Sequence, residues 1–443
     1  MMEMSMATTP RNLALGVALL ALTTGAAFAG QAQRQPSTIV ERAPLTQSKT
    51  LVDSYPATDK TPGVVATVGR GDSAPTVLAA GTIASDAGAA KADENSLWRV
   101  YSMTKPITAM AAMMLVEQGK LKLDQPISDF IPAFKNMTVL VDPMKDLTAR
   151  PATTPITVRH LMTHTAGLGY TIITQGPLLK EYERNGITPF SANESVEAQL
   201  RLVRPKSLEE FANRVAKLPL IAEPGTKWSY SIGLDVLGRV VEVASGMPFE
   251  TYLDKRIFRP LKMNSSYFTV PGKDAGRLVT GYTWVGANRV PLDPGATSIF
   301  LKPPSFPYGG AGLVMSAHDY DRFLHMLQNG GSLDGVRLMK PETVALAMSN
   351  LLPAGVTYGG AVANTGGATG PMQGFGAGGS VYLVDVPGGP SKGTYGWGGA
   401  AGTIAWVDPA RKLRATVMVN YLPGEKWPLR RDFTKALYAD LAQ

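Results

Sequence analysis

The stretch Ser102-Met103-Thr104-Lys105 stands at the start of a long apolar segment of this 443-residue chain. A serine hydroxyl is a poor nucleophile at its own pKa, and a lysine within hydrogen-bond reach can help to activate it. Residues three apart share one face of a helix, so the two side chains would meet there. The motif alone is weak evidence, because about one S-x-x-K is expected by chance in a chain of this length.

The residues after this motif predict a buried helix from Ser102 to Gly119. Apolar side chains recur there at helical spacing, at Ile107, Met110, Ala111, Met114 and Leu115. Pro106 falls in the first turn, where its missing N–H costs nothing. Upstream, the β-branched segments 64–68 and 76–81 flank a Gly-Asp turn and predict a β-hairpin.

The end of the chain returns to strand patterns. Segments 381–384, 402–407 and 414–419 predict strands, and 428–441 predicts a closing helix. We therefore expect one sheet built from both ends of the chain, in an α/β domain of residues 61–120 and 375–443. A mostly helical region, 121–374, would be inserted between them, with the site in the cleft between the two parts.

The N-terminus predicts export. Arg11 precedes an apolar run from Leu13 to Ala29 that ends in Ala27-Phe28-Ala29, a pattern typical of a signal peptide cleaved after residue 29. An N-terminal membrane anchor is the alternative, but the run is short for a bilayer. We expect an exported protein, periplasmic or extracellular, with no stable membrane insertion after cleavage. A polar lead-in of residues 30–60 would follow.

The composition excludes several kinds of chemistry. The chain has no cysteine, hence no disulfide, thiol nucleophile or lipoprotein attachment site. Its net charge is +8, but the basic residues are scattered and not interleaved with aromatic ones, so no nucleic-acid partner is expected. A solvated basic surface is the simpler interpretation, and weak attraction to an anionic envelope is the alternative.

The four histidines do not point to a metal or to a histidine-based nucleophile. No G-x-S-x-G is present, so an α/β-hydrolase nucleophile elbow is unsupported. His160 and His164 lie four apart but lack the glutamate of H-E-x-x-H, so we interpret them as two structural histidines near a helix end. We expect no metal and no cofactor.

Tyr230 is the candidate base. It follows Glu223-Pro224-Gly225-Thr226 and precedes a predicted helix, and most tyrosines in such a place are packed rings with a satisfied hydroxyl. Beside a lysine ammonium, however, its phenolate is favoured and could take the serine proton. Alternatively the lysine itself is neutral because of burial.

Together these segments resemble the serine β-lactamase and penicillin-binding superfamily, in its class C-like branch and closest to the family VIII carboxylesterases. The resemblance covers nearly all of residues 61–443. The matching stretches are 102–109, 123–127, 156–168, 224–238, 309–314 and 395–403. It implies a β-lactamase/transpeptidase-like fold, α/β plus all-α, in which helices flank an antiparallel sheet built from both termini and a helical domain is inserted.

The resemblance also implies roles for individual residues. Ser102 would be the acylated nucleophile, Lys105 its activating partner and Tyr230 the general base. The strand Trp397-Gly398-Gly399 would line the site where lactamases have Lys-Thr-Gly. The N–H groups of Ser102 and Ala400 would form the oxyanion hole, where each donor can contribute roughly 2.7–4 kcal/mol.

Two departures from the lactamase pattern favour an ester substrate. Ile232 stands where the family usually has asparagine, and Trp397 replaces the lysine of Lys-Thr-Gly, so an apolar wall replaces two polar handles. Lys392 is a possible substitute cation. We therefore expect an exported serine hydrolase that cleaves small-molecule carboxylic esters of short acyl chains. The sequence leaves its oligomeric state open.

Two alternatives remain open. One is a class C-like β-lactamase, D-aminopeptidase or DD-peptidase, and the other is a non-catalytic penicillin-recognising module. The glycine-rich segment from Gly366 to Gly379 is either the edge of a lid or a long connection.

Overall fold

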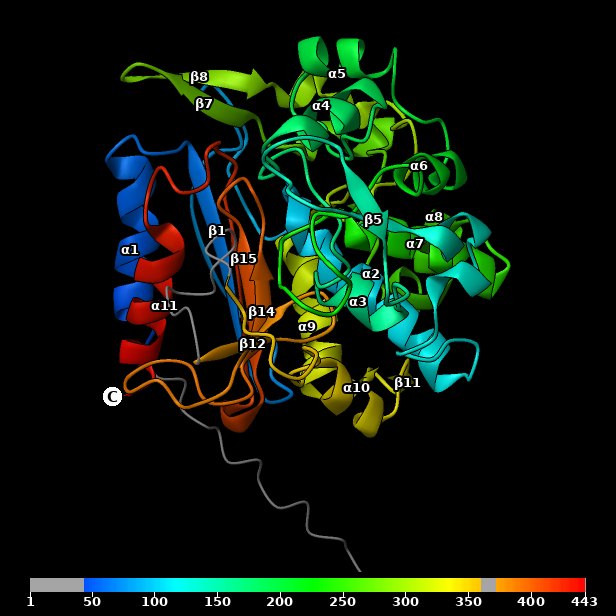
Figure 1. Ribbon diagram of the computed structural model, residues 1–443. Coiled ribbons are helices and arrows are strands. Elements are labelled where there is room, and N and C mark those ends of the chain that lie inside the picture. Colours follow the sequence, from blue (N-terminus) through cyan, green and yellow to red (C-terminus); the bar gives the residue numbers. More distant parts are fainter. Residues whose placement is uncertain (1–43, 360–371, 443) are drawn as a thin grey trace, which may run out of the picture. The chain divides into compact units, whose positions relative to one another are not determined.

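Strands from both ends of the chain form one sheet, as the sequence predicts (Figure 1). The computed structural model describes residues 44–359 and 372–442. Within them every pairing in this seven-stranded sheet is antiparallel. Its strands, in spatial order, are β12 (Gln373–Phe375), β13 (Ser380–Tyr382), β14 (Tyr395–Gly398), β15 (Ile404–Asp408), β16 (Leu413–Met418), β1 (Gly63–Arg70) and β2 (Thr76–Gly81).

The two faces of the sheet bury different apolar cores, because side chains alternate along each strand. Val64 and Ala66 of β1 pack with the helices α1 (Thr46–Ala57) and α11 (Leu429–Asp440) on one face. Val65, between them, packs into the larger core on the other face. Because both faces of the sheet are covered, β1 is buried from Gly63 to Gly69. Its sequence is therefore mostly apolar and does not alternate between polar and apolar residues.

Helix α1 falls in the segment predicted to be a polar lead-in. The N–H groups of Gln47 and Ser48 both donate to the carboxylate of Asp440, at 2.9 Å each, which joins α1 to the end of α11. The predicted signal peptide and the lead-in up to residue 43 lie outside the described residues. No helix among the described residues is both long and apolar enough to cross a bilayer.

The central helix α2 (Thr104–Glu117) confirms the buried helix predicted after Ser102. All its residues from Thr104 to Leu115 are buried, as expected for a mostly apolar helix in the core of the fold. It contacts both the sheet, at β14, and the inserted region, at α7. It therefore places its first turn where the two parts of the chain meet.

Helices alternate with short strands and irregular segments in the region between the two ends of the chain. Its helices are α3 (Val158–Met162), α4 (Pro177–Arg184), α5 (Glu194–Leu200), α6 (Leu208–Val215), α7 (Gly233–Ser245), α8 (Phe249–Leu253), α9 (Ala317–Gln328) and α10 (Pro341–Ala347). The short strands outside the seven-stranded sheet pair with one another in smaller sheets. These are β3 (Leu97–Arg99), β4 (Thr138–Leu140), β5 (Ala149–Pro151), β6 (Ser266–Tyr267), β7 (Gly281–Val285), β8 (Asn288–Asp293), β9 (Val314–Ser316), β10 (Ser332–Leu333) and β11 (Val336–Arg337).

The predicted loop from Gly366 to Gly379 is only partly tested. Residues 366–371 lie outside the described residues. Gln373–Phe375 forms strand β12 at the edge of the sheet, so this part is a strand and not a loop. Strand β12 is held by its backbone pairing with β13. A glycine-rich sequence has few side chains whose alternation could predict such a strand.

Candidate active site

A strained turn presents Ser102 between β3 and α2. The 3₁₀ turn Tyr101–Met103 precedes α2, and Tyr101 has a φ of +42°, which is unfavourable for a residue other than glycine. The carbonyl of Met103 accepts a hydrogen bond from the buried Tyr320 hydroxyl at 3.0 Å. The fold thus fixes the position of Ser102, whose residue surface is 8% exposed.

The structure brings together the three side chains predicted to be catalytic. Tyr230 Oη lies 2.7 Å from Ser102 Oγ, and Lys105 Nζ lies 3.2 Å from the same oxygen. Lys105 Nζ also donates to the Gly310 carbonyl at 2.8 Å. Both groups that could take or give the serine proton are therefore in direct contact with it.

Aromatic rings enclose this group. The Tyr230 ring packs against His164, Tyr170 and Trp397, with centroid distances of 4.7, 5.5 and 5.9 Å. Lys105 Nζ lies 4.6 Å from the centre of the Tyr230 ring. With water largely excluded, charges interact more strongly here than at the protein surface.

Strand β14 ends against the nucleophile's turn. A Cβ on Gly399 would lie 2.2 Å from the Val100 carbonyl oxygen, so only glycine allows this approach. The Gly399 N–H donates to Thr403 O at 2.8 Å and closes a turn after Gly398. The N–H of the exposed Ala400 has no acceptor among the described residues, as an oxyanion donor requires.

Ile232, one of the predicted site residues, packs into the apolar core. It is 0% exposed, belongs to the large apolar core, and donates its N–H to Gly169 O at 3.1 Å. Its side chain thus helps to pack the start of α7. Trp397, in contrast, contacts the Tyr230 ring directly.

Arg430 lies at the site, although the sequence did not predict it. From the first turn of α11 its guanidinium donates to the Gly399 carbonyl, and its charge interacts with Tyr230. Burial lowers the pKa of Arg430. The exposed Lys392, considered from the sequence as a substitute cation, precedes β14 at the end opposite to Gly399. In the sequence, the adjacent Arg430 and Arg431 were the one feature that could have indicated this residue, but such a pair is typical of surface charge.

His160 and His164 have different environments. The His160 ring accepts the Thr157 N–H at 3.2 Å and closes a capping box at α3, so His160 is structural, as predicted. His164 lies beside the site, where its Nδ1 accepts the Ser231 N–H at 3.1 Å. Burial holds the pKa of His164 well below its usual range, so its ring is neutral. No cluster of metal-ligating side chains occurs within residues 44–359 and 372–442.

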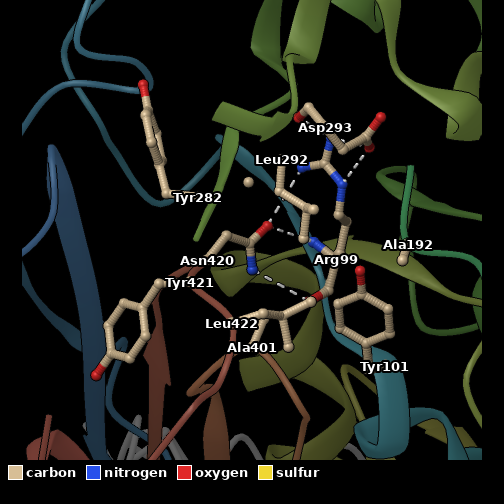
Figure 2. A pocket seen from close by; sticks show the side chains of 11 residues that line it. Arg99, Tyr101, Ala192, Tyr282, Leu292, Asp293, Ala401, Asn420, Tyr421 and Leu422 are labelled. Atoms are coloured by element: carbon tan, nitrogen blue, oxygen red, sulfur yellow. Dashed lines mark hydrogen bonds and ion pairs between the residues drawn. The ribbon is translucent and has the colours of Figure 1, made fainter. Parts of the chain in front are cut away.

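A pocket beside the nucleophile's turn is lined by Tyr101 and by a buried ion pair (Figure 2). Arg99, at the end of β3, donates to Asp293 through Nε at 2.8 Å and through Nη2 at 2.5 Å. Asn420 Oδ1 accepts the Arg99 N–H at 3.0 Å. Tyr101 and Ala401 line the same pocket, which links it to the residues flanking the site.

The sheet built from both ends of the chain, the helical insertion and the Ser-Lys-Tyr cluster between them define the serine β-lactamase and penicillin-binding class of fold. The family model described as Beta-lactamase matches residues 49–439. The chain therefore belongs to this family.

Individual relatives agree with this assignment. Esterase EstB of Burkholderia gladioli is 33% identical over 374 residues, covering 78% of this chain and 83% of that protein. The structure of EstCE1, described as a hydrolase with promiscuous acyltransferase activity, matches with a TM-score of 0.69 and 26% identity, covering 89% of this chain and 98% of that one. The LovD9 mutant of simvastatin synthase from Aspergillus terreus matches with a TM-score of 0.71 and 25% identity, over 90% and 100% of the two chains.

Proposed function

We propose that this protein is a serine hydrolase that cleaves carboxylic esters through an acyl-enzyme on Ser102. One observation carries the proposal. Ser102 Oγ lies within hydrogen-bond distance of both Tyr230 Oη, at 2.7 Å, and Lys105 Nζ, at 3.2 Å. A nucleophile in contact with a base, which a third group orients, is the arrangement that covalent catalysis requires.

In the proposed reaction Ser102 Oγ attacks the ester carbonyl carbon while its proton passes to Tyr230 Oη. The Lys105 ammonium favours the phenolate form that accepts this proton. The tetrahedral oxyanion is stabilised by the Ser102 and Ala400 N–H groups. Collapse of this intermediate breaks the bond to the alcohol oxygen, which receives the proton from Tyr230. Water, activated by the same base, then hydrolyses the acyl-enzyme.

The walls of the site support a neutral, apolar acyl group of short length. The rings of Tyr170 and Trp397 pack against the Tyr230 ring, whose hydroxyl contacts the nucleophile, and apolar walls with a few polar groups are typical of sites for such ligands. Among the relatives, the name of Esterase EstB also refers to ester cleavage.

Transfer of the acyl group to an alcohol is a second candidate activity. Ser102 is only 8% exposed, and its partner Tyr230 packs against Trp397, so we infer that little water surrounds the acyl-enzyme. An alcohol that fits the site would compete well with water under these conditions. The description of EstCE1 names an acyltransferase activity of that protein. An added alcohol acceptor should therefore yield a new ester when acyl products are analysed.

Parallel kinetics on p-nitrophenyl butyrate and nitrocefin, with Ser102→Ala as the blank, test the proposal. We expect efficient ester turnover and slow nitrocefin hydrolysis. The reverse ranking, or release of D-alanine from a peptide at a comparable rate, would favour the lactamase or peptidase alternative. Stoichiometric acylation without turnover would favour the penicillin-recognising module.

We also propose export with cleavage after Ala29, on the basis of the N-terminal apolar run and its Ala27-Phe28-Ala29 site. N-terminal sequencing of the protein recovered from the exported fraction should begin at Gly30. Recovery of the intact N-terminus from the cell interior would contradict this proposal.

A further inference from the structure

Asp235, in the first turn of α7, is a buried carboxyl that the reaction above does not use. Its side chain is 0% exposed, and its Oδ1 accepts the Gly310 N–H at 2.8 Å. Its other oxygen, Oδ2, is buried without a hydrogen-bond partner. A carboxylate in such a place is costly unless a positive charge lies near it. Lys105 supplies that charge.

Gly310 connects Asp235 to the site. Its N–H donates to Asp235, while its carbonyl accepts from Lys105 Nζ at 2.8 Å. A Cβ on Gly310 would lie 2.6 Å from Asp235 Oδ2, so only glycine allows this close approach. The Thr108 hydroxyl holds the neighbouring Gly309 carbonyl at 2.6 Å. Residues 309–310, which accept the hydrogen bond from Lys105, are thus held by Thr108 of α2 on one side and by Asp235 on the other.

The carboxyl of Asp235 can change its charge near neutral pH. Burial raises the pKa of Asp235 to about 7, although the nearby Lys105 ammonium opposes this rise. Tyr170 also faces Asp235, and burial together with the Asp235 charge raises the pKa of that phenol well above its usual value. Tyr170 therefore stays neutral while Asp235 titrates. The hydrogen bonds of the buried Lys105 go to Ser102 Oγ and to Gly310 O.

We propose that Asp235 is a positioning residue for Lys105, holding the Gly310 carbonyl that receives the ammonium and supplying the buried charge that keeps the ammonium against Ser102. This inference rests on the proposed function, since it takes Ser102 as the nucleophile. With Asp235 ionised, its negative charge compensates the buried positive charge of Lys105. With Asp235 protonated, the buried ammonium loses this compensation and acylation slows.

The test is the pH dependence of kcat and KM for p-nitrophenyl butyrate, measured on the full chain from about pH 5.5 to 9. In the wild-type protein kcat/KM should fall on the acid side with a midpoint near pH 7, as Asp235 takes up its proton. Asp235→Asn keeps an acceptor for the Gly310 N–H but carries no charge. It should lower kcat at pH 8 by about tenfold or more, leave KM within about twofold, and abolish the acid limb.

Asp440→Asn is the matched control. Asp440 is also 0% exposed, and its carboxylate accepts two N–H groups of α1 on the far face of the sheet. This variant should keep the wild-type profile. An acid limb that persists in Asp235→Asn, or a wild-type profile without that limb, would overturn the inference.

A second variant covers the case in which Asp235→Asn does not fold. Gly310→Ala places a Cβ against Asp235 and so disturbs the contact between Gly310 and Asp235. It should also lower kcat and weaken the acid limb. A normal kcat with a normal limb in that variant would overturn the inference.

Ser102→Ala separates the two hypotheses: full ester turnover in Ser102→Ala refutes the proposed function itself. Loss of turnover there, with an unchanged profile in Asp235→Asn, refutes only the role of Asp235.

Discussion

The hydroxyl of Tyr230 is the only polar atom of its side chain, and its ring is held by neighbouring rings on several sides. Tyr230→Phe should therefore keep the fold and remove the proton acceptor. We expect kcat/KM for p-nitrophenyl butyrate to fall by about 10²–10⁴-fold, the usual contribution of a positioned base. Steady-state kinetics and a thermal melt of the same preparation measure both expectations.

The matched control is Tyr438→Phe, which removes a buried hydroxyl that donates to Asp408 at 2.8 Å on the α11 side of the sheet. It should reduce stability by about 1–3 kcal/mol, because it leaves Asp408 without that partner, and leave the kinetics unchanged. A Tyr230→Phe enzyme within tenfold of wild type would contradict the assignment of Tyr230 as the base.

The sequence predicts Ser102, Lys105 and Tyr230 because each lies in a local motif with a spacing that the chemistry requires. Their contacts around Ser102 Oγ now support that grouping. Arg430 and Asp235 were not assigned to the site, since their roles depend on tertiary contacts. Arg430 reaches Gly399 from the closing helix, and the hydrogen-bonded link from Asp235 to Lys105 passes through Gly310. A single sequence carries no pattern for such indirect neighbours.

At the scale of elements, the end of β14 and the turn before α2 must pack without a side chain between them. In Gly399→Ala the new Cβ would lie 2.2 Å from Val100 O and 2.4 Å from Thr403 Oγ1. A backbone oxygen cannot move aside cheaply, so β14 should shift and misplace the Ala400 N–H. We expect kcat to fall by about 10²-fold or more, the effect of losing one oxyanion donor, with a smaller change in KM.

Gly276→Ala is the control for this prediction, because a Cβ there would meet nothing within 4 Å. Its kinetics should match wild type. Full activity in Gly399→Ala would show that the end of β14 does not position the oxyanion site.

The ion pair between Arg99 of β3 and Asp293 of β8 joins the strand before the nucleophile to the β7–β8 hairpin (Figure 2). Their side chains are only 1% and 3% exposed. Asp293→Ala leaves a buried guanidinium unpaired and should cost about 3–5 kcal/mol in the free energy of unfolding. Urea unfolding measures this loss. Asp53→Ala, which breaks the exposed Lys49–Asp53 pair, should cost less than about 1 kcal/mol. Equal losses in the two variants would contradict the structural role of the buried pair.

The strands and the long helices could be predicted from local patterns, and the shortest elements could not. Helix α2 begins at Thr104 and not at Ser102, because a 3₁₀ turn precedes the helix and begins at Tyr101 with a positive φ. Helix α3 has only 5 residues and depends on the capping box of Thr157 with His160. Isolated helices of that length are unstable in water, so tertiary contacts decide where they form.

At the scale of the whole molecule, the arrangement of the sheet follows from apolar strand patterns at both ends of the chain. The sequence did not indicate that α1 packs against α11, because the segment before residue 60 is polar and rich in proline. Its apolar contacts come from a few side chains, such as Val52 and Tyr55. The contact is completed by the carboxylate of Asp440, which lies 393 residues away from Gln47.

The stability of the molecule should depend on pH through Asp235. Its pKa is about 7 in the fold, against 3.8 for an ordinary aspartate. Below about pH 4 Asp235 is protonated in both the folded and the unfolded state, and the stability that this protonation gives the fold is fully present. As the pH rises towards 7 only the unfolded chain releases the proton, so stability falls by about 1.4 kcal/mol per pH unit. Above pH 7 both states are ionised, and the loss is constant.

Asp235→Asn has no proton to release and should lack this fall. The free energy of unfolding of Asp235→Asn relative to wild type should therefore increase by roughly 3 kcal/mol between pH 5 and pH 8. Urea unfolding at each pH measures both proteins. His164, whose burial lowers its pKa, acts in the opposite direction below pH 6.5, but it is present in both proteins and cancels in the difference. Parallel stability curves would mean that Asp235 is ionised throughout this range, and the buried charge beside Lys105 would then be permanent.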